Sequence, residues 1–260
     1  MVSASSFRPG DPYERLSVER DAELEGLLTI TLQRPEKLNA LDIRLHDELQ
    51  HLCTELQTAH DARVVLLTGA GRAFSAGAEL GDRRPEPPVN DLDRRARAHL
   101  GGRTCELFER LPQVTIAAVN GLAVGGGLVL LTCCDLRIAA ESAWFSIPEV
   151  ALDIPLTWNA LPRLVREIGP ARTKELVMAC DRFSSAEALQ WGFVNRVVPD
   201  GDLLPRAREL AAKLLEKDAV AVAQTKTTVN ALANLMVPAE ATHADPDYLV
   251  LARLLREART

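Results

Sequence analysis

Long apolar runs are missing from this chain of 260 residues. No stretch approaches the ~20 consecutive apolar residues that a membrane-spanning helix needs. The first twelve residues also lack the apolar segment of a signal peptide. These absences predict a cytoplasmic protein that has no membrane partner.

Metal-binding patterns and an excess of positive charge are lacking as well. The five cysteines include no C-x-x-C pair, and the five histidines show no H-E-x-x-H or comparable spacing. We therefore expect no metal site and no disulfide framework. The 30 Lys and Arg residues are outnumbered by 36 Asp and Glu, and the resulting net charge of -6 argues against nucleic-acid binding.

What the chain does contain is an alternation of β-like and helical patterns. Such alternation with buried apolar strands predicts an α/β fold built on a largely parallel sheet. The pattern predicts strands over 27–32, 64–68, 114–119, 135–139, 144–147 and 194–199. It predicts helices over 43–59 (capped by Asp42), 92–110, 171–180, 186–191 (capped by Ser185), 203–235 and 248–256.

Three successive glycines, Gly125 to Gly127, stand between the β-like run 114–119 and an apolar run compatible with a helix. Without a Cβ the chain can turn sharply here and a ligand can approach the backbone. The free N–H groups of a helix start favour negative charge, as on a carbonyl oxygen that becomes an oxyanion. Taken alone, the triplet is equally consistent with a glycine-rich packing turn.

A second glycine-bearing loop follows the apolar run 64–68. It is not a dinucleotide fingerprint (G-x-G-x-x-G), because Phe74 occupies the position of the third glycine. It is not a nucleophile elbow (G-x-S-x-G) either, because Ala73 stands two residues before Ser75, where that motif requires glycine. Together with the triplet, this loop could offer two backbone N–H groups to one oxygen.

Five ordered stretches resemble successive signatures of the crotonase (enoyl-CoA hydratase/isomerase) superfamily. They are R-P-E-K-L-N-A-L (34–41), G-A-G-R-A-F-S-A-G-A-E-L (69–80), A-A-V-N-G-L-A-V-G-G-G (117–127), C-D-L-R-I-A (134–139) and F-S-I-P-E (145–149). The resemblance spans residues 14 to 257, and several motifs in order are far more specific than one glycine cluster.

The resemblance implies a spiral of ββα units with a C-terminal helical region, and an acyl-CoA thioester as substrate with no separate cofactor. It divides the chain into a flexible tail (1–12), a spiral core that holds the acyl-CoA site (13–200) and a helical region used for trimerisation (201–260). We expect a homotrimer or a dimer of trimers.

Mapped by resemblance, the oxyanion hole consists of the backbone N–H groups of Ala78 and Gly126. The same mapping predicts a set of residues that contact CoA or the substrate: Arg34, Lys37, Leu38, Ala40, Ala76, Glu79, Leu80, Gly81 and Gly125. For the basic members of this set, a solvated surface charge is an equally good interpretation.

The chain departs from the hydratase pattern at one of two expected glutamates. The position two residues after the third glycine is Val129, which cannot transfer a proton, whereas Glu149 is retained. Thr157 stands where dienoyl-CoA isomerases carry an aspartate. The segment 155–159 replaces a glycine-rich turn, so Val129, Thr157 and Trp158 are candidates for a narrower or reshaped acyl pocket.

Glu149 therefore carries the catalytic hypothesis. One carboxylate can remove a proton α to the thioester carbonyl and return it at the γ carbon. This favours isomerisation of a Δ3- to a Δ2-enoyl-CoA, or an atypical hydration. Two alternatives remain: another crotonase chemistry (acyl-CoA hydrolase, decarboxylase or C–C lyase), or a catalytically impaired CoA-binding protein in which Glu149 only bonds local backbone.

Overall fold

Two β-sheets organise the computed structural model, which describes residues 12–81 and 87–258. The larger sheet has the order β1 (Leu16–Arg20), β2 (Leu27–Leu32), β3 (Val64–Gly69), β5 (Val114–Val119), β7 (Leu136–Ala140) and β10 (Arg196–Val198). The smaller sheet has the order β4 (Ala73–Ser75), β6 (Leu122–Val124), β8 (Trp144–Ser146) and β9 (Phe183–Ser184). Only the β1–β2 and β8–β9 pairs of these sheets are antiparallel.

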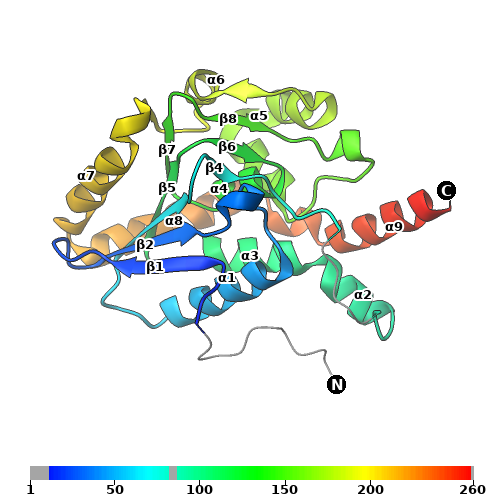
Figure 1. The fold of residues 1–260 in the computed structure, drawn as a ribbon, viewed down its shortest axis with the longest axis horizontal. Coiled ribbons are helices and arrows are strands. Elements are labelled where there is room, and N and C mark those ends of the chain that lie inside the picture. Colours follow the sequence, from blue (N-terminus) through cyan, green and yellow to red (C-terminus); the bar gives the residue numbers. More distant parts are fainter. Residues whose placement is uncertain (1–11, 82–86, 259–260) are drawn as a thin grey trace.

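The chain alternates between the two sheets, which confirms the predicted spiral of ββα units. From β3 to β8, each turn places one strand in the larger sheet and the next in the smaller, and a helix follows, whereas β1 and β2 both lie in the larger sheet (Figure 1). Strands β3 and β5 are buried along their whole length, which explains why they read as continuous apolar runs. The carboxyl ends of the parallel strands thus bring the two glycine-bearing loops to one region.

Helices fill the connections of the spiral and form the C-terminal region. Those of the core are α1 (Ile43–Leu56), α2 (Asp91–Ala98), α3 (Leu100–Glu109), α4 (Gly126–Thr132), α5 (Ala160–Ala179) and α6 (Ser185–Gln190). The C-terminal ones are α7 (Leu203–Leu215), α8 (Ala219–Met236) and α9 (Asp245–Glu257). Short 3₁₀ turns are η1 (Pro35–Lys37), η2 (Val150–Leu152), η3 (Asp200–Asp202) and η4 (Ala239–Thr242).

Asp42 caps α1 as predicted, because its carboxylate accepts from the Leu45 N–H at 2.7 Å. The predicted cap of α6 was wrong by one residue: Ser184 accepts from the Glu187 N–H, and Glu187 accepts from the Ser184 N–H.

Three helix predictions differ from the structure in length. The predicted helix 92–110 is two helices that meet at His99, and 203–235 is divided between α7 and α8. Helix α5 begins at Ala160, well before the predicted start at 171, and its backbone breaks at Gly169, where φ is 76°. Periodicity missed these breaks because the apolar pattern continues across them.

The C-terminal helices spread along the molecule (Figure 1), where α7 covers one end and α9 runs out at the other. Helix α9 packs against α2, and α8 contacts β5, where the Lys226 side chain pairs with Asp135 at 2.7 Å. No helix in the described ranges is long and apolar enough to cross a membrane. The predicted tail falls, apart from Pro12, outside the described residues.

Candidate active site

In the loop after β4, the N–H of Ala78 points away from the neighbouring segment that contains Leu41. Ala78 forms an isolated parallel bridge with Leu41, in which the Leu41 N–H donates to Gly77 O at 2.7 Å and the Glu79 N–H donates to Leu41 O at 3.1 Å. Because residues 77 and 79 make these bonds, the N–H of Ala78 points to the other side of the strand. It donates to no acceptor within the described residues.

The second N–H belongs to Gly126, the first residue of α4. The N–H of Gly125 is engaged by Ser146 O at 2.9 Å, whereas that of Gly126 donates to no group in the described part of the chain. It is a helix-terminal donor aligned with the α4 dipole.

The two free N–H groups lie side by side because glycines line the contact. A Cβ on Gly77 would stand 3.0 Å from Gly126 N and 2.5 Å from Val124 O, and a Cβ on Gly126 would stand 3.3 Å from Ala78 N. Gly77 also has φ of 87°, which favours glycine. The backbone therefore brings together two convergent donors of the kind that stabilises an oxyanion.

Glu149 lies beside these donors, directly before η2. A Cβ on Gly125, whose φ is 50°, would stand 2.6 Å from Glu149 Oε1, so the carboxyl group rests against this glycine. Glu149 Oε2 is buried and has no hydrogen-bond partner. Burial raises the pKa of Glu149 to about 7, and no neighbouring charge contributes. A carboxylate so placed can accept or donate a proton near neutral pH.

Trp158 occupies the opposite side of Gly126. Its indole fills the space where a Cβ on Gly101 of α3 or on Gly126 would stand, with Cη2 2.5 Å from the latter position. The His46 ring meets it edge to face, with centroids 5.1 Å apart. The neighbouring Thr157 is 9% exposed, and its carbonyl accepts from the Ala160 N–H.

Comparison with known proteins agrees with this geometry. A sequence profile described as "Enoyl-CoA hydratase/isomerase" matches residues 22–251. The chain belongs to the enoyl-CoA hydratase/isomerase family. It is an acyl-CoA enzyme of that family, with the crotonase fold.

Individual members carry different names. A short-chain-enoyl-CoA hydratase of Clostridium acetobutylicum is 35% identical over 210 residues, 80% of this chain and 79% of that protein. An enoyl-CoA hydratase from Bacillus anthracis has a TM-score of 0.78 at 35% identity, covering 92% of this chain and 90% of that one. A monofunctional enoyl CoA isomerase from M. smegmatis has a TM-score of 0.71 at 32% identity, covering 85% and 94%.

Val129 lies on α4 of this family member, one turn after Gly126. It is 1% exposed and belongs to the hydrophobic core, and its N–H donates to Gly125 O at 2.9 Å. An apolar side chain at this position supplies no proton. Asp153, the next carboxylate after Glu149 in the sequence, is exposed at the end of η2 with φ of 58°.

The residues predicted to contact CoA come from two segments that the fold places together. The Ala76 N–H donates to Leu38 O at 2.9 Å, so the 34–41 and 76–81 segments run side by side. Lys37, Gly81 and Leu80 are exposed, the last at 69%. Contact of this surface with CoA stays a prediction.

Arg34 has a different environment from the one expected of a phosphate ligand. Its guanidinium is 8% exposed, pairs with Glu79 at 2.7 Å and Asp42 at 3.3 Å, and donates to Ala40 O at 2.7 Å. These two ion pairs connect the segment before α1 to the loop that carries Ala78. Its donors are thus largely engaged by the protein, which does not favour the predicted phosphate contact.

Sequence reasoning missed Arg163, Asn159 and Gly101, which surround Trp158. Two adjacent glycines inside a helical pattern, 101 and 102, were the available signal, since glycine in a helix interior is unfavourable without a packing reason. His46, which lies off the apolar stripe of α1, is also buried and bonds Thr104 at 2.9 Å. Burial lowers its pKa to about 4, so it is neutral at physiological pH.

Proposed function

We propose that the chain isomerises Δ3-enoyl-CoA thioesters to Δ2-enoyl-CoA thioesters with Glu149 as the only acid/base. The observation that carries the proposal is the unpaired, buried Oε2 of Glu149 beside the two free N–H groups. A buried carboxyl oxygen without a partner is costly, and such costs are found at functional sites.

The two backbone donors stabilise the charge that develops on the substrate. When the proton α to the thioester carbonyl leaves, the electron pair delocalises onto the thioester oxygen and the C3–C4 double bond. Ala78 N–H and Gly126 N–H hold that oxygen in the proposed complex. Loss of one such donor typically costs about 2.7–4 kcal/mol of transition-state stabilisation.

Glu149 moves the proton between two carbons. Its carboxylate takes the proton from C2, becomes a neutral acid, and returns the same proton to C4, so the new double bond lies between C2 and C3. A pKa of about 7 suits both proton transfers. Near neutral pH the group is ionised often enough to accept the proton from C2, and its neutral form is acidic enough to donate that proton to C4. No second acid is required.

Within the described residues Glu149 has no second carboxylate partner, which favours isomerisation over hydration. Addition of water needs one group to activate water and a proton source for C2. Val129 supplies neither, and no charged side chain contributes to the pKa of Glu149. Because several relatives are named as hydratases, atypical hydration is the competing outcome of the test.

The decisive experiment compares 3-enoyl-CoA and 2-enoyl-CoA as substrates in H₂¹⁸O. The proposal expects conversion of the 3-enoyl thioester without ¹⁸O in the product, and a loss of about 10²–10⁴-fold in kcat for Glu149→Gln. Product that contains ¹⁸O and forms equally fast in the variant would refute it. Release of free CoA or CO₂ would indicate another crotonase chemistry.

Asp153→Asn is the matched control for that substitution. Asp153 is exposed, and asparagine tolerates its left-handed backbone. The control variant should retain wild-type kcat.

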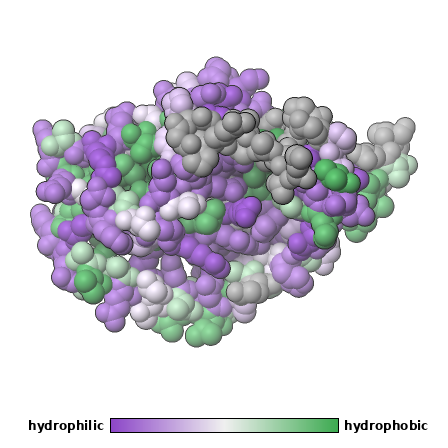
Figure 2. All heavy atoms as spheres, turned by 90° about the horizontal axis from the view of Figure 1, so that it is seen from below, coloured by the Kyte–Doolittle hydropathy of each residue, from purple (hydrophilic) through white to green (hydrophobic). Residues whose placement is uncertain are grey.

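The family assembly is also proposed for this chain. Helix α8 exposes five apolar side chains: Val220, Val229, Leu232, Leu235 and Met236. Figure 2 shows further apolar side chains at the end of the molecule that carries α2 and α9. Exposed apolar patches of this kind support subunit contacts. Sedimentation analysis should give a trimer or hexamer; a monomer at micromolar concentration would contradict this.

A further inference from the structure

We infer that Trp158 closes the acyl end of the site and restricts the enzyme to short acyl groups. The inference rests on the proposed function in one respect only: the thioester oxygen must bind at Ala78 and Gly126. It assigns to Trp158 the role of a specificity-determining residue.

The position of the indole is the first argument. The edge of the ring that includes Cη2 faces Gly126, so it lies next to one of the two oxyanion donors. With the thioester oxygen on that donor, Glu149 lies on the Gly125 side and the indole on the other. An acyl chain that extends away from the carbonyl therefore meets the ring within a few bonds.

The surroundings of the ring show that it is built into the structure. Gly101 lacks the Cβ that would overlap with the indole, although it lies inside α3. The His46 ring supports the indole at an interplanar angle of 86°, and His46 is itself fixed by Thr104. The ring thus rests between two helices, α1 and α3, and the oxyanion hole.

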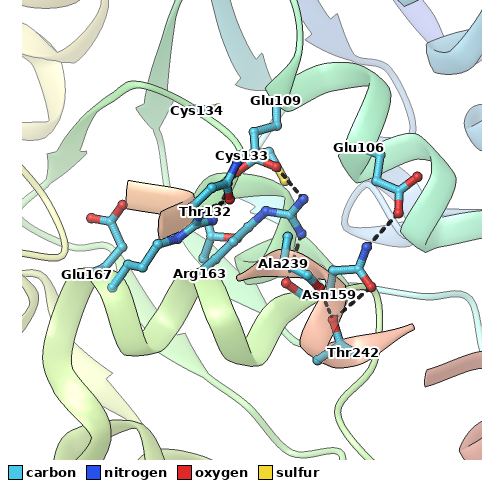
Figure 3. Close-up of polar contacts among 12 residues, drawn as sticks. Glu106, Glu109, Thr132, Cys133, Cys134, Asn159, Arg163, Glu167, Ala239 and Thr242 are labelled. Atoms are coloured by element: carbon cyan, nitrogen blue, oxygen red, sulfur yellow. Dashed lines mark hydrogen bonds and ion pairs between the residues drawn. The ribbon is translucent and has the colours of Figure 1, made fainter. Parts of the chain in front are cut away.

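The backbone beneath the ring is held in an uncommon conformation. Trp158 and Asn159 both have left-handed backbones, with φ of 65° and 57°. Arg163, 1% exposed, holds this turn: Nη1 donates to the carbonyls of Trp158 at 2.9 Å and Asn159 at 3.0 Å. Its Nη2 donates to Glu109 at 2.6 Å, so Arg163 connects this turn to α3 (Figure 3).

Asn159 fixes the same turn from the other direction. Its Nδ2 donates to Glu106 at 2.6 Å and its Oδ1 accepts from Thr242 at 3.0 Å (Figure 3). Its N–H donates to Asp245 at the start of α9, at 2.9 Å. These bonds fix the backbone that carries Trp158, while the indole itself is held by packing against Gly101, Gly126 and the His46 ring.

The test measures binding of saturated acyl-CoA thioesters by calorimetry, from butyryl- through hexanoyl- and octanoyl- to decanoyl-CoA. Saturated thioesters lack the reacting double bond, so their dissociation constants do not depend on which reaction the enzyme performs. An open apolar pocket binds longer chains more tightly, since each buried methylene is favourable. The wild-type protein should instead bind decanoyl-CoA at least about 10-fold more weakly than butyryl-CoA.

Removal of the ring should reverse that preference. In Trp158→Ala the affinity for decanoyl-CoA should rise about 10- to 200-fold relative to wild type, while butyryl-CoA changes little. Trp158→Phe, with a smaller ring, should be intermediate. Trp191→Ala is the matched control, because Trp191 packs on Phe183 elsewhere in the core, and it should keep the wild-type profile.

Two results would overturn the inference. One is wild-type binding of decanoyl-CoA as tight as that of butyryl-CoA, which decides the question even if a variant does not fold. The other is an unchanged profile in a folded Trp158→Ala. Failure of the isomerase assay with the expected binding profile would refute the proposed reaction and leave this inference intact.

Discussion

Replacing Glu149 by glutamine tests the physical state of the candidate base independently of its reaction. Burial raises the pKa of Glu149 to about 7 from 4.5. The folded protein therefore binds this proton more tightly than the unfolded chain does. Below pH 4.5 the group is protonated in both states and contributes nothing. Above pH 7 it is ionised in both, and folding then costs about 3 kcal/mol more than it does with the neutral group.

Glutamine is neutral at every pH and removes that cost. The free energy of unfolding of Glu149→Gln relative to wild type should therefore increase by about 2.5 kcal/mol between pH 5 and pH 8. Any constant effect of the amide, which inherits the unpaired position of Oε2, cancels in this difference. The variant should thus gain relative stability as pH rises while it loses activity.

Urea unfolding at fixed protein concentration measures the difference, because assembly would otherwise change the apparent stability. Glu36→Gln, at an exposed residue of η1, is the control and should show no pH-dependent difference. A stability difference for Glu149→Gln that stays flat from pH 5 to pH 8 would refute the reasoning, since it would mean that the carboxyl group has an ordinary pKa in the folded protein.

Three further predictions use the same structure. The kcat/KM for a 3-enoyl-CoA should rise with pH to a plateau with its midpoint near the Glu149 pKa of about 7, because the free enzyme needs the carboxylate; a midpoint near 4.5 would contradict this. Gly125→Ala places a Cβ 2.6 Å from Glu149 Oε1 and should lower kcat about 10²-fold or more, whereas Gly201→Ala, with open space around its Cβ, should not. Arg163→Met removes one of the two arginine partners of Glu109, leaving Arg166, and takes a donor from two carbonyls; it should lower the free energy of unfolding by about 1–3 kcal/mol, and a loss no larger than that of Arg206→Met, at an exposed ion pair, would show that the buried arginine contributes little.

Much of the fold follows from local patterns in the sequence. The strand predicted over 27–32 is observed with those bounds, and the apolar runs at 64–68 and 114–119 are the buried strands β3 and β5. Each run consists of β-forming residues and has a glycine or proline near one of its ends. Helix boundaries were less predictable, because the apolar pattern continues across the breaks at His99 and between α7 and α8.

The site could be predicted only in part, for a related reason. Motifs located Ala78, Gly126 and Glu149, but whether Glu149 has a partner depends on groups far away in the chain. Trp158 shows this most clearly, since its left-handed turn is stabilised by Arg163 and by contacts of Asn159 with three other elements. No local pattern encodes those contacts, so the sequence could name Trp158 as a pocket candidate but could not place its ring.

The burial that suits Glu149 to its proposed role as base also makes its charged form unfavourable for stability. Within the described residues no charged neighbour shifts the pKa of its carboxyl group and one of its oxygens is unpaired, so burial is the main cause of the raised pKa, opposed only by a hydrogen bond from its own backbone. A paired carboxylate would stabilise the fold but would hold its charge too firmly to return a proton to carbon. Trp158 lies against Gly126, next to the glycine on which the Glu149 carboxyl group rests, and if its ring also keeps water from that group, the ring contributes to the raised pKa. Removing the indole by Trp158→Ala should therefore admit water and lower the kinetic pKa of Glu149 below 7. A purely steric role for the ring would not produce this shift.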